Sequence, residues 1–288
     1  MTAPEKLLRN PGALCNMVKR IAFEAGEIIL NHFEEGAGIS TSRPTETKPD
    51  GSPVTAADRD AERYIHLALL QLLPDVPVIA EEAAAHGPLP DCAQAPYFWL
   101  VDPLDGTRGF TEGSVDYTVN IGLVRRGEPG NGSFAEPLIG VVYAPARGVL
   151  YAGHGPGTAT RWLAENDHEK SIEVRRTPRA GLTMMTSSSP DEPARLDAFL
   201  EGFKVEKIIR RASALKICAI AEGKADFYPR FGAVYEWDTA AGDAVLRAAG
   251  GLITDMNGQP MTYGHADRAF KTPDFVASAF EWFGVAEE

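Results

Sequence analysis

The residues best suited to chemistry lie in one short segment about a third of the way along the chain. Its sequence is WLVDPLDGT, which runs from Trp99 to Thr107. Asp102 and Asp105 follow an apolar strand-like run, and the proline and glycine make the chain turn, so the two carboxylates can converge. The same turn exposes the backbone carbonyl of Leu104 as a third oxygen ligand. Oxygen-only ligands suit Mg²⁺ or Mn²⁺ rather than zinc, so the segment predicts a divalent cation site, with an Asp-rich turn that holds no metal as the alternative.

Acidic residues also stand at two other predicted element ends. Glu81 and Glu82 follow an apolar strand-like run, and Asp238 precedes a strongly helical run. Taken alone, the glutamate pair would be a helix cap or a solvated pair, and Asp238 would be an ordinary helix N-cap. Carboxylates at three separate element ends point to one shared cation site, because uncompensated like charges in a cleft are costly.

A polar loop before a predicted helix offers a group for proton handling. The loop reads KPDGSPVT, from Lys48 to Thr55. Asp50 is predicted to accept a hydrogen bond from the hydroxyl of Thr107 and so to position the nucleophile. Thr55 and Asp58 have the spacing of a capping box at the start of the helix. A loop that only leads into that helix is the alternative.

The elements that must position these residues alternate between helices and strands. Apolar residues at helical spacing predict helices over 14–33 and from about 55 to 72. Short β-type runs predict strands over 77–82, 97–102, 117–124, 138–143 and 149–152, a long hairpin loop over 125–137, and an irregular stretch, read as an insertion, over 153–170. In the second half we expect strands over 183–187, 226–230, 252–254 and 275–279, and helices after Pro190, after Ser213 and over 239–249. Such a mixture indicates a layered α/β or α+β architecture.

Length and composition limit the classes of function. With 288 residues, the chain is expected to divide near Ala180 into a half over 1–180 that carries most metal ligands and a half over 181–288 that carries Asp238 and the specificity residues. A net charge of −12 argues against a nucleic-acid polymer as partner but not against a small anion held beside cations. No signal-peptide pattern or long apolar run is present, so a cytoplasmic protein without a transmembrane segment is expected, with peripheral attachment to the inner face of the membrane as the alternative. Three widely spaced cysteines predict neither a zinc knuckle nor a disulfide framework.

Together these motifs resemble the inositol monophosphatase superfamily. The resemblance is carried in order by the segments DGSPVTAAD (50–58), EE (81–82), DPLDGT (102–107) and WDTAAG (237–242). Within the superfamily, the SPVTAAD, WDTAAG and YPRF (228–231) segments look like those of the CysQ-type 3'(2'),5'-bisphosphate nucleotidases. The chain departs from that group at 187–190, where SSSP replaces a Ser-Arg-Ser-His-like segment that usually contacts the second phosphate of the nucleotide. The resemblance covers about residues 14–258.

This resemblance implies a fold, a reaction and a metal set. The fold would be a layered α-β-α-β-α sandwich of the inositol monophosphatase and sugar phosphatase type. The protein would hydrolyse 3'-phosphoadenosine 5'-phosphate to AMP and phosphate with a metal-activated water. One Mg²⁺ would be held by Glu81, Asp102 and the Leu104 carbonyl, and a second by Asp102, Asp105 and Asp238. A third, weaker ion would lie near Glu81, Mn²⁺ would substitute, and lithium inhibition and a place in sulfur metabolism are implied as well.

The resemblance also assigns roles to individual residues. Asp50, Thr107 and Glu81 would be catalytic. The substrate would contact a wider set that includes every metal ligand except Asp102: Glu81, Leu104, Asp105, Gly106, Thr107, Ser213, Lys216, Arg230 and Asp238. Read from the residues alone, Lys216 and Arg230 have the alternative of surface cations, and Ser213 that of a helix N-cap.

Three other functions compete with this interpretation. A phosphatase of the haloacid dehalogenase type uses Asp-x-Asp-Gly-Thr, but here the spacing is one residue longer, from Asp102 to Thr107. A phosphatase for inositol 1-phosphate or a sugar phosphate is the alternative within the superfamily. A non-catalytic module that binds metal or anions would explain the carboxylates but gives no role to Asp50 and Thr107.

Overall fold

The computed structural model describes residues 3–34, 38–39, 46–47, 53–127, 135–187 and 192–283. Its helices are α1 (Ala3–Leu8), α2 (Pro11–Leu30), α3 (Ala56–Leu72), α4 (Glu81–His86), α5 (Thr107–Thr111), α6 (Pro193–Leu200), α7 (Leu215–Ala221) and α8 (Glu236–Ala248), with 3₁₀ turns η1 (Pro145–Arg147) and η2 (Ala266–Arg268). Its strands are β1 (Phe33–Glu34), β2 (Gly38–Ile39), β3 (Glu46–Thr47), β4 (Pro53–Val54), β5 (Val78–Ala80), β6 (Tyr97–Asp105), β7 (Thr118–Arg125), β8 (Glu136–Ala144), β9 (Val149–Gly153), β10 (Thr160–Leu163), β11 (His168–Ser171), β12 (Leu182–Thr186), β13 (Val205–Arg210), β14 (Phe227–Arg230), β15 (Leu252–Asp255) and β16 (Phe275–Ser278).

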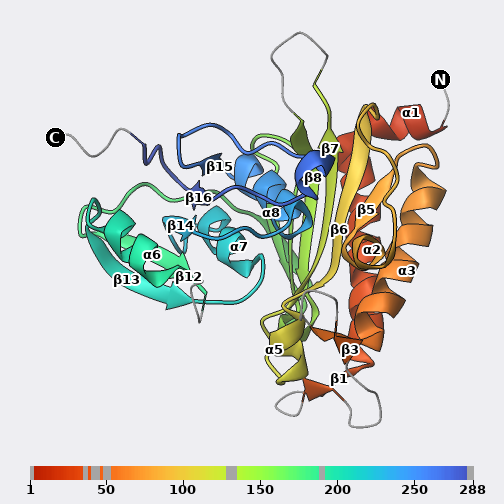
Figure 1. Ribbon diagram of the computed structural model, residues 1–288, viewed down its shortest axis with the longest axis horizontal. Helices are drawn as coiled ribbons and strands as arrows, with labels where there is room; N and C mark the ends of the chain where they lie inside the picture. The colour runs from red at the N-terminus through yellow and green to blue at the C-terminus, as the bar shows by residue number, and fades with distance from the viewer. Residues whose placement is uncertain are drawn as a thin grey trace.

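Five layers are stacked across the molecule, as Figure 1 shows. Helices α2 and α3 cover one face of a seven-stranded sheet with the order β11-β10-β9-β8-β7-β6-β5. Helices α7 and α8 lie between that sheet and a five-stranded sheet with the order β13-β12-β14-β16-β15. Helix α6 packs on the outer face of the second sheet. The predicted α-β-α-β-α sandwich is therefore confirmed. The chain passes from the first sheet to the second between β11 and β12, and the division into two halves near Ala180 stays a prediction.

The two long N-terminal helices form where the sequence predicts them, with differences at their ends. Helix α2 begins at Pro11, three residues earlier than predicted, because the Asn10 side chain caps it by accepting a hydrogen bond from the Ala13 amide at 3.2 Å. Helix α3 begins after Thr55, whose pairing with Asp58 is the predicted capping box. Each helix buries an apolar stripe against the first sheet.

The structure differs from the predicted elements in several places. Residues 153–170 are no irregular insertion, because β10 and β11 form a hairpin that extends the first sheet beyond β9. Strand β13 was missed. Both β11 and β13 lie at sheet edges and are largely exposed, so neither shows the apolar alternation from which a strand is predicted. The strand predicted over 77–82 stops at Ala80, and Glu81 opens the helix α4 instead.

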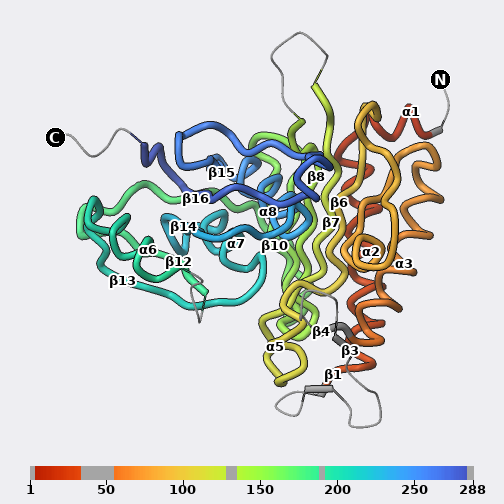
Figure 2. The backbone as a smooth tube through the Cα atoms, viewed as in Figure 1, coloured from red at the N-terminus to blue at the C-terminus, as the bar shows by residue number. Residues whose placement is uncertain are grey.

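Helix α8 rests directly on the backbone of the first sheet. The backbone trace in Figure 2 shows this late helix lying beside β8. A Cβ atom on Gly140 of β8 would lie only 2.0 Å from the Ala241 carbonyl oxygen, and one on Gly122 of β7 would lie 3.1 Å from the Ala241 amide. These glycines thus permit the close packing that fixes the start of α8, where Asp238 stands. Among the described residues, no helix is long and apolar enough to cross a membrane.

Candidate active site

Three of the predicted carboxylate ligands come together from separate elements. Oxygen atoms of Glu81, Asp102 and Asp238 all lie within 4.8 Å of one another. Glu81 opens α4, Asp102 lies near the end of β6, and Asp238 lies in the first turn of α8. Asp102 is 1% exposed, and the other two are half-buried. The structure therefore converts three distant sequence positions into one buried acidic cluster, which we call the carboxylate cluster.

Leu104 and Asp105 are the last two residues of β6 and follow Asp102 of the carboxylate cluster. The Oδ1 atom of Asp102 accepts a hydrogen bond from the Leu104 amide at 3.0 Å. The Oδ2 atom of Asp105 accepts hydrogen bonds from the Ala214 amide at 2.7 Å and from the Asn120 side chain at 3.2 Å. One oxygen of Asp105 is thus held by neighbouring elements, and its charge still acts on the pKa of Asp102 and Asp238.

The electrostatics of this region favour bound cations. Burial raises the pKa of Asp102 well above its ordinary value, and the charges of Glu81 and Asp105 raise it further. The pKa of Asp238 is also raised well above its ordinary value, first by burial and then by Asp105. An all-oxygen donor set of this kind fits Mg²⁺ or Mn²⁺, because a divalent cation would supply the positive charge that lets these carboxylates stay ionised.

The hydroxyl of Thr107 has a partner that the sequence interpretation did not assign to it. Its Oγ1 atom lies 3.0 Å from Oδ1 of Asp58 and 2.9 Å from the Leu104 carbonyl oxygen. The predicted partner, Asp50, lies outside the described residues. Asp58 is 1% exposed, and its Oδ2 accepts hydrogen bonds from the Thr55 amide at 2.7 Å and the Thr55 hydroxyl at 2.6 Å. The capping box therefore fixes one oxygen of Asp58 and presents the other to Thr107.

The predicted specificity residues line one cavity beside the carboxylate cluster. Its volume is about 210 Å³, and its walls include Asp105, Ser213, Lys216, Arg230 and Asp238. The ammonium of Lys216, which is only 7% exposed, donates to the Ser213 carbonyl at 2.8 Å. The guanidinium of Arg230 donates to Ser187 Oγ and to the Gly232 carbonyl, each at 3.3 Å. We call this space the basic cavity, because it places two cations next to the acidic site.

Ser213 does not occupy the N-cap position that its sequence context suggested. The residue directly before α7 is Ala214, which offers no side-chain cap. Ser213 stands one residue earlier in the left-handed backbone region, with φ of 55°, and its Oγ lies 3.5 Å from the Leu215 amide. This conformation turns the chain so that the Ala214 amide reaches Asp105.

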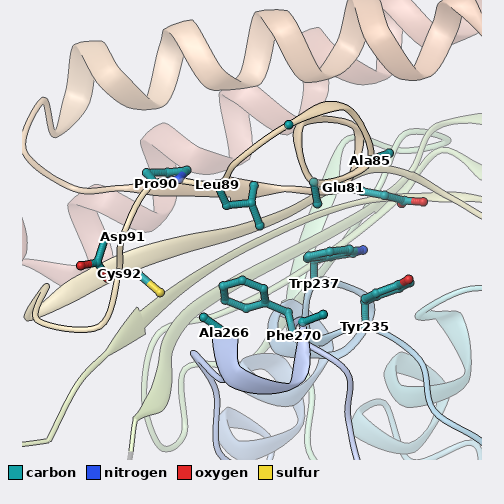
Figure 3. A pocket seen from close by; sticks show the side chains of 13 residues that line it. Glu81, Ala85, Leu89, Pro90, Asp91, Cys92, Tyr235, Trp237, Ala266 and Phe270 are labelled. Atoms are coloured by element: carbon teal, nitrogen blue, oxygen red, sulfur yellow. The ribbon is translucent and has the colours of Figure 1, made fainter. Parts of the chain in front are cut away.

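A larger cavity lies on the Glu81 side of the carboxylate cluster, and Figure 3 shows it from close by. Its volume is about 540 Å³, and Glu81, Leu89, Tyr235, Trp237 and Phe270 contribute to its walls. The Tyr235 and Trp237 rings stack, with centroids 4.6 Å apart and an interplanar angle of 10°. No lysine or arginine is among the described residues that line it, so an anionic part of a ligand is better placed in the basic cavity.

The buried carboxylates predict how the stability of the metal-free protein depends on pH. Because the folded-state pKa of Asp102 is raised, the folded state binds protons that the unfolded state has released above the ordinary carboxyl pKa of about 3.9. Stability in a chelator should therefore fall as the pH rises above about 4. Thermal unfolding of the wild type and of Asp102→Asn in EDTA would measure this. We expect the wild type to be the less stable of the two near pH 8 and the difference to shrink toward pH 5; parallel curves would contradict the prediction.

Comparisons with known proteins are consistent across sequence and structure. A family model described as the inositol monophosphatase family matches residues 13–280. The 3'(2'),5'-bisphosphate nucleotidase CysQ of Escherichia coli strain K12 is 37% identical over 269 residues, which are 93% of this chain and 100% of that protein. The solved structure of CysQ from Bacteroides thetaiotaomicron, a bacterial member of the same family, is 29% identical with a TM-score of 0.74 and covers 93% of this chain and 98% of that one. Inositol monophosphatase from Anabaena is 24% identical with a TM-score of 0.70, over 94% of this chain and 92% of that one, and supports the fold alone.

Proposed function

The chain belongs to the inositol monophosphatase family, and from this membership we propose that it is a metal-dependent 3'(2'),5'-bisphosphate nucleotidase. Its reaction would be the hydrolysis of 3'-phosphoadenosine 5'-phosphate to AMP and phosphate. The observation that carries the proposal is the basic cavity, which holds Lys216 and Arg230 directly beside the carboxylate cluster. A substrate with two phosphates matches this arrangement. One phosphate can bind the metal ions of the carboxylate cluster, while the other binds Lys216 and Arg230.

The geometry of the carboxylate cluster supports the predicted metal ligands. Glu81, Asp102 and Asp238 would hold the cations. We propose that the Leu104 carbonyl and the Oδ1 atom of Asp105, two and three residues after Asp102, complete the set. Two Mg²⁺ ions, with a third and weaker one near Glu81, and Mn²⁺ as a substitute remain our proposal. When bound, such ions lower the pKa of a coordinated water and neutralise the charge of a phosphate.

The remaining chemistry belongs to the side chains of the protein. The Thr107 hydroxyl, oriented by Asp58, would steer the attacking water and take part in the removal of its proton. The water oxygen attacks phosphorus, the bond between phosphorus and the 3' oxygen breaks, and the departing oxygen takes up a proton. The amides of Gly106 and Thr107 would bind phosphate oxygens, because Gly106 has φ of 98° and so turns the backbone at this point. Positioning and charge neutralisation would supply most of the rate.

A direct comparison of substrates tests the proposed function. We expect kcat/KM with Mg²⁺ to be highest for 3'-phosphoadenosine 5'-phosphate among three compounds, the others being inositol 1-phosphate and fructose 1,6-bisphosphate. A preference for either of the others would replace the nucleotidase by an inositol- or sugar-phosphate phosphatase. Absence of phosphate release from all three would leave the alternative of a non-catalytic metal-binding module.

Substitution of Lys216 by Met tests the role of the basic cavity. A charge-assisted hydrogen bond contributes about 1.5–3 kcal/mol, so the preference for 3'-phosphoadenosine 5'-phosphate over adenosine 3'-monophosphate should fall about 10- to 100-fold. The ratio of the two kcat/KM values measures this preference directly. Lys224→Met is the matched control, because Lys224 is 60% exposed and pairs with Glu222 outside the basic cavity. An unchanged ratio in Lys216→Met would exclude Lys216 from binding the second phosphate.

A further inference from the structure

The first turn of α4, which carries Glu81, is held by a residue from a different helix. The residue before α4, Ala80, provides no side-chain cap. Instead, the carboxylate of Glu62 on α3 accepts a hydrogen bond from the Glu82 amide at 2.7 Å and another from the Ala83 amide at 2.8 Å. Glu62 is 9% exposed. Both of its oxygens are thus used to fix backbone amides directly after Glu81.

A short helix such as α4 needs this kind of support. It has only six residues, and an isolated helix of that length is unstable because nucleation costs more than a few hydrogen bonds return. The position of the Glu81 carboxylate depends on the backbone of that first turn, while its cluster partner Asp102 belongs to β6. Any loosening of the first turn would therefore move Glu81 relative to the other ligands.

The negative charge of Glu62 is unfavourable where it lies, because the side chain is buried and two other glutamates are close. Burial raises the pKa of the Glu62 carboxyl to about 7, and the charges of Glu82 and Glu81 add to this rise. A neutral side chain would avoid this repulsion, but a carboxylate gives the strong charge-assisted hydrogen bonds to two amides. The two hydrogen bonds to the Glu82 and Ala83 amides, at 2.7 and 2.8 Å, are the contacts that hold Glu62 beside the acidic cluster.

Helix α3, which carries Glu62, also carries the residue that orients Thr107. Asp58, which orients Thr107, lies one helical turn before Glu62 on α3. We propose that Glu62 is a positioning residue that sets the affinity of the carboxylate cluster for divalent cations, by fixing the first turn of α4 and with it Glu81. This inference rests on the metal site of the proposed function. Helix α3 would then align the metal ligand Glu81 and the hydroxyl of Thr107 as one rigid unit.

Metal binding by Glu62→Gln tests the inference. A glutamine offers one oxygen acceptor and places an NH₂ group against the second amide, so the first turn of α4 loses at least one hydrogen bond. We expect Mn²⁺ affinity, measured by calorimetry without substrate, to fall about 10- to 100-fold. The Mg²⁺ concentration for half-maximal activity should rise by a similar factor, while saturating Mg²⁺ should restore kcat close to the wild-type value.

Asp226→Asn is the matched control for a purely structural effect. Asp226 is also a fully buried carboxylate that accepts a backbone hydrogen bond, from the Thr183 amide at 2.6 Å, and it pairs with Arg175 in the second sheet. We expect this variant to lose thermal stability with unchanged Mn²⁺ affinity. Wild-type Mn²⁺ affinity in Glu62→Gln, with a lowered Tm, would overturn the inference. If Glu62→Gln does not fold, Glu62→Asp, whose shorter side chain cannot reach both amides, must show the same weakening of Mn²⁺ binding.

The measurement without substrate separates this inference from the proposed reaction. A wrong nucleotide substrate would leave the difference in Mn²⁺ affinity between wild type and Glu62→Gln intact. A wild-type protein that binds no Mn²⁺ would overturn the metal site and the role of Glu62 together.

Discussion

Replacing Asp102 by Asn is expected to lower kcat by at least about 10⁴-fold while the protein stays folded. Asp102 is the buried member of the carboxylate cluster, and the charges of Glu81, Asp105 and Asp238 all act on it. Its loss would weaken the binding of every cation in the cluster. A 10⁴-fold effect corresponds to about 5.4 kcal/mol of transition-state stabilisation, which is consistent with the several kcal/mol that a metal ion contributes. Phosphate release at saturating Mg²⁺ measures the loss.

The fold of Asp102→Asn can be checked independently of activity. Because the substitution removes one buried charge from a repelling group, the metal-free variant should unfold at a higher temperature than the metal-free wild type near pH 8. Asp226→Asn again serves as the control, since it should retain activity while losing stability. Near-normal turnover by purified Asp102→Asn would refute the assignment of the carboxylate cluster as the catalytic metal site.

Replacing Asp58 by Asn is expected to lower kcat about 10²- to 10³-fold with little change in Mn²⁺ affinity. General acid–base groups contribute about 10²- to 10⁴-fold, and Asp58 reaches the reaction only through the Thr107 hydroxyl, 3.0 Å away. An asparagine can direct its NH₂ group toward Thr107, which would reverse the hydrogen bond and misdirect the hydroxyl proton. Thr107→Val should show a loss of similar size, and the double variant should cost little more than either single one.

Asp50→Asn distinguishes the two candidate partners of Thr107. The sequence interpretation gave this role to Asp50, whereas the described structure gives it to Asp58. If Asp58 is the catalytic partner of Thr107, Asp50→Asn should lose far less activity than Asp58→Asn. A larger loss in Asp50→Asn would restore the original interpretation.

The carboxylate cluster was more accessible to sequence reasoning than its supports. Turn-forming residues next to an apolar run predict the position of Asp102. The helical run after Asp238 predicts a helix start near that residue. Both signals are local in the sequence. The role of Asp58 was missed because a capping box explains it fully by itself. The sequence signal that remains is its spacing from Thr55, which fixes one oxygen and leaves the other available.

Glu62 and the basic cavity show the limit of local patterns. Glu62 caps a helix that begins 19 residues later in the sequence, and no spacing rule connects two helices whose contact is made only by the fold. Lys216 and Arg230 face the same cavity from α7 and β14, and each alone is indistinguishable from a surface cation. Edge strands such as β11 escaped for a related reason, since exposure removes the alternation that marks a strand.

Helix α8 packs directly on Gly122 and Gly140, so these two positions matter for the site although neither carries a reactive group. A methyl group at Gly140 would come within 2.0 Å of the Ala241 carbonyl oxygen, and relief would require the whole helix to lift from the sheet. Asp238 lies in the first turn of that helix, so a substitution that adds only one carbon far from any reacting atom would pull a ligand out of its cluster. Substitutions are therefore constrained at positions that contact no substrate. A survey of harmful variants would include changes at glycines, which have no side chain of their own.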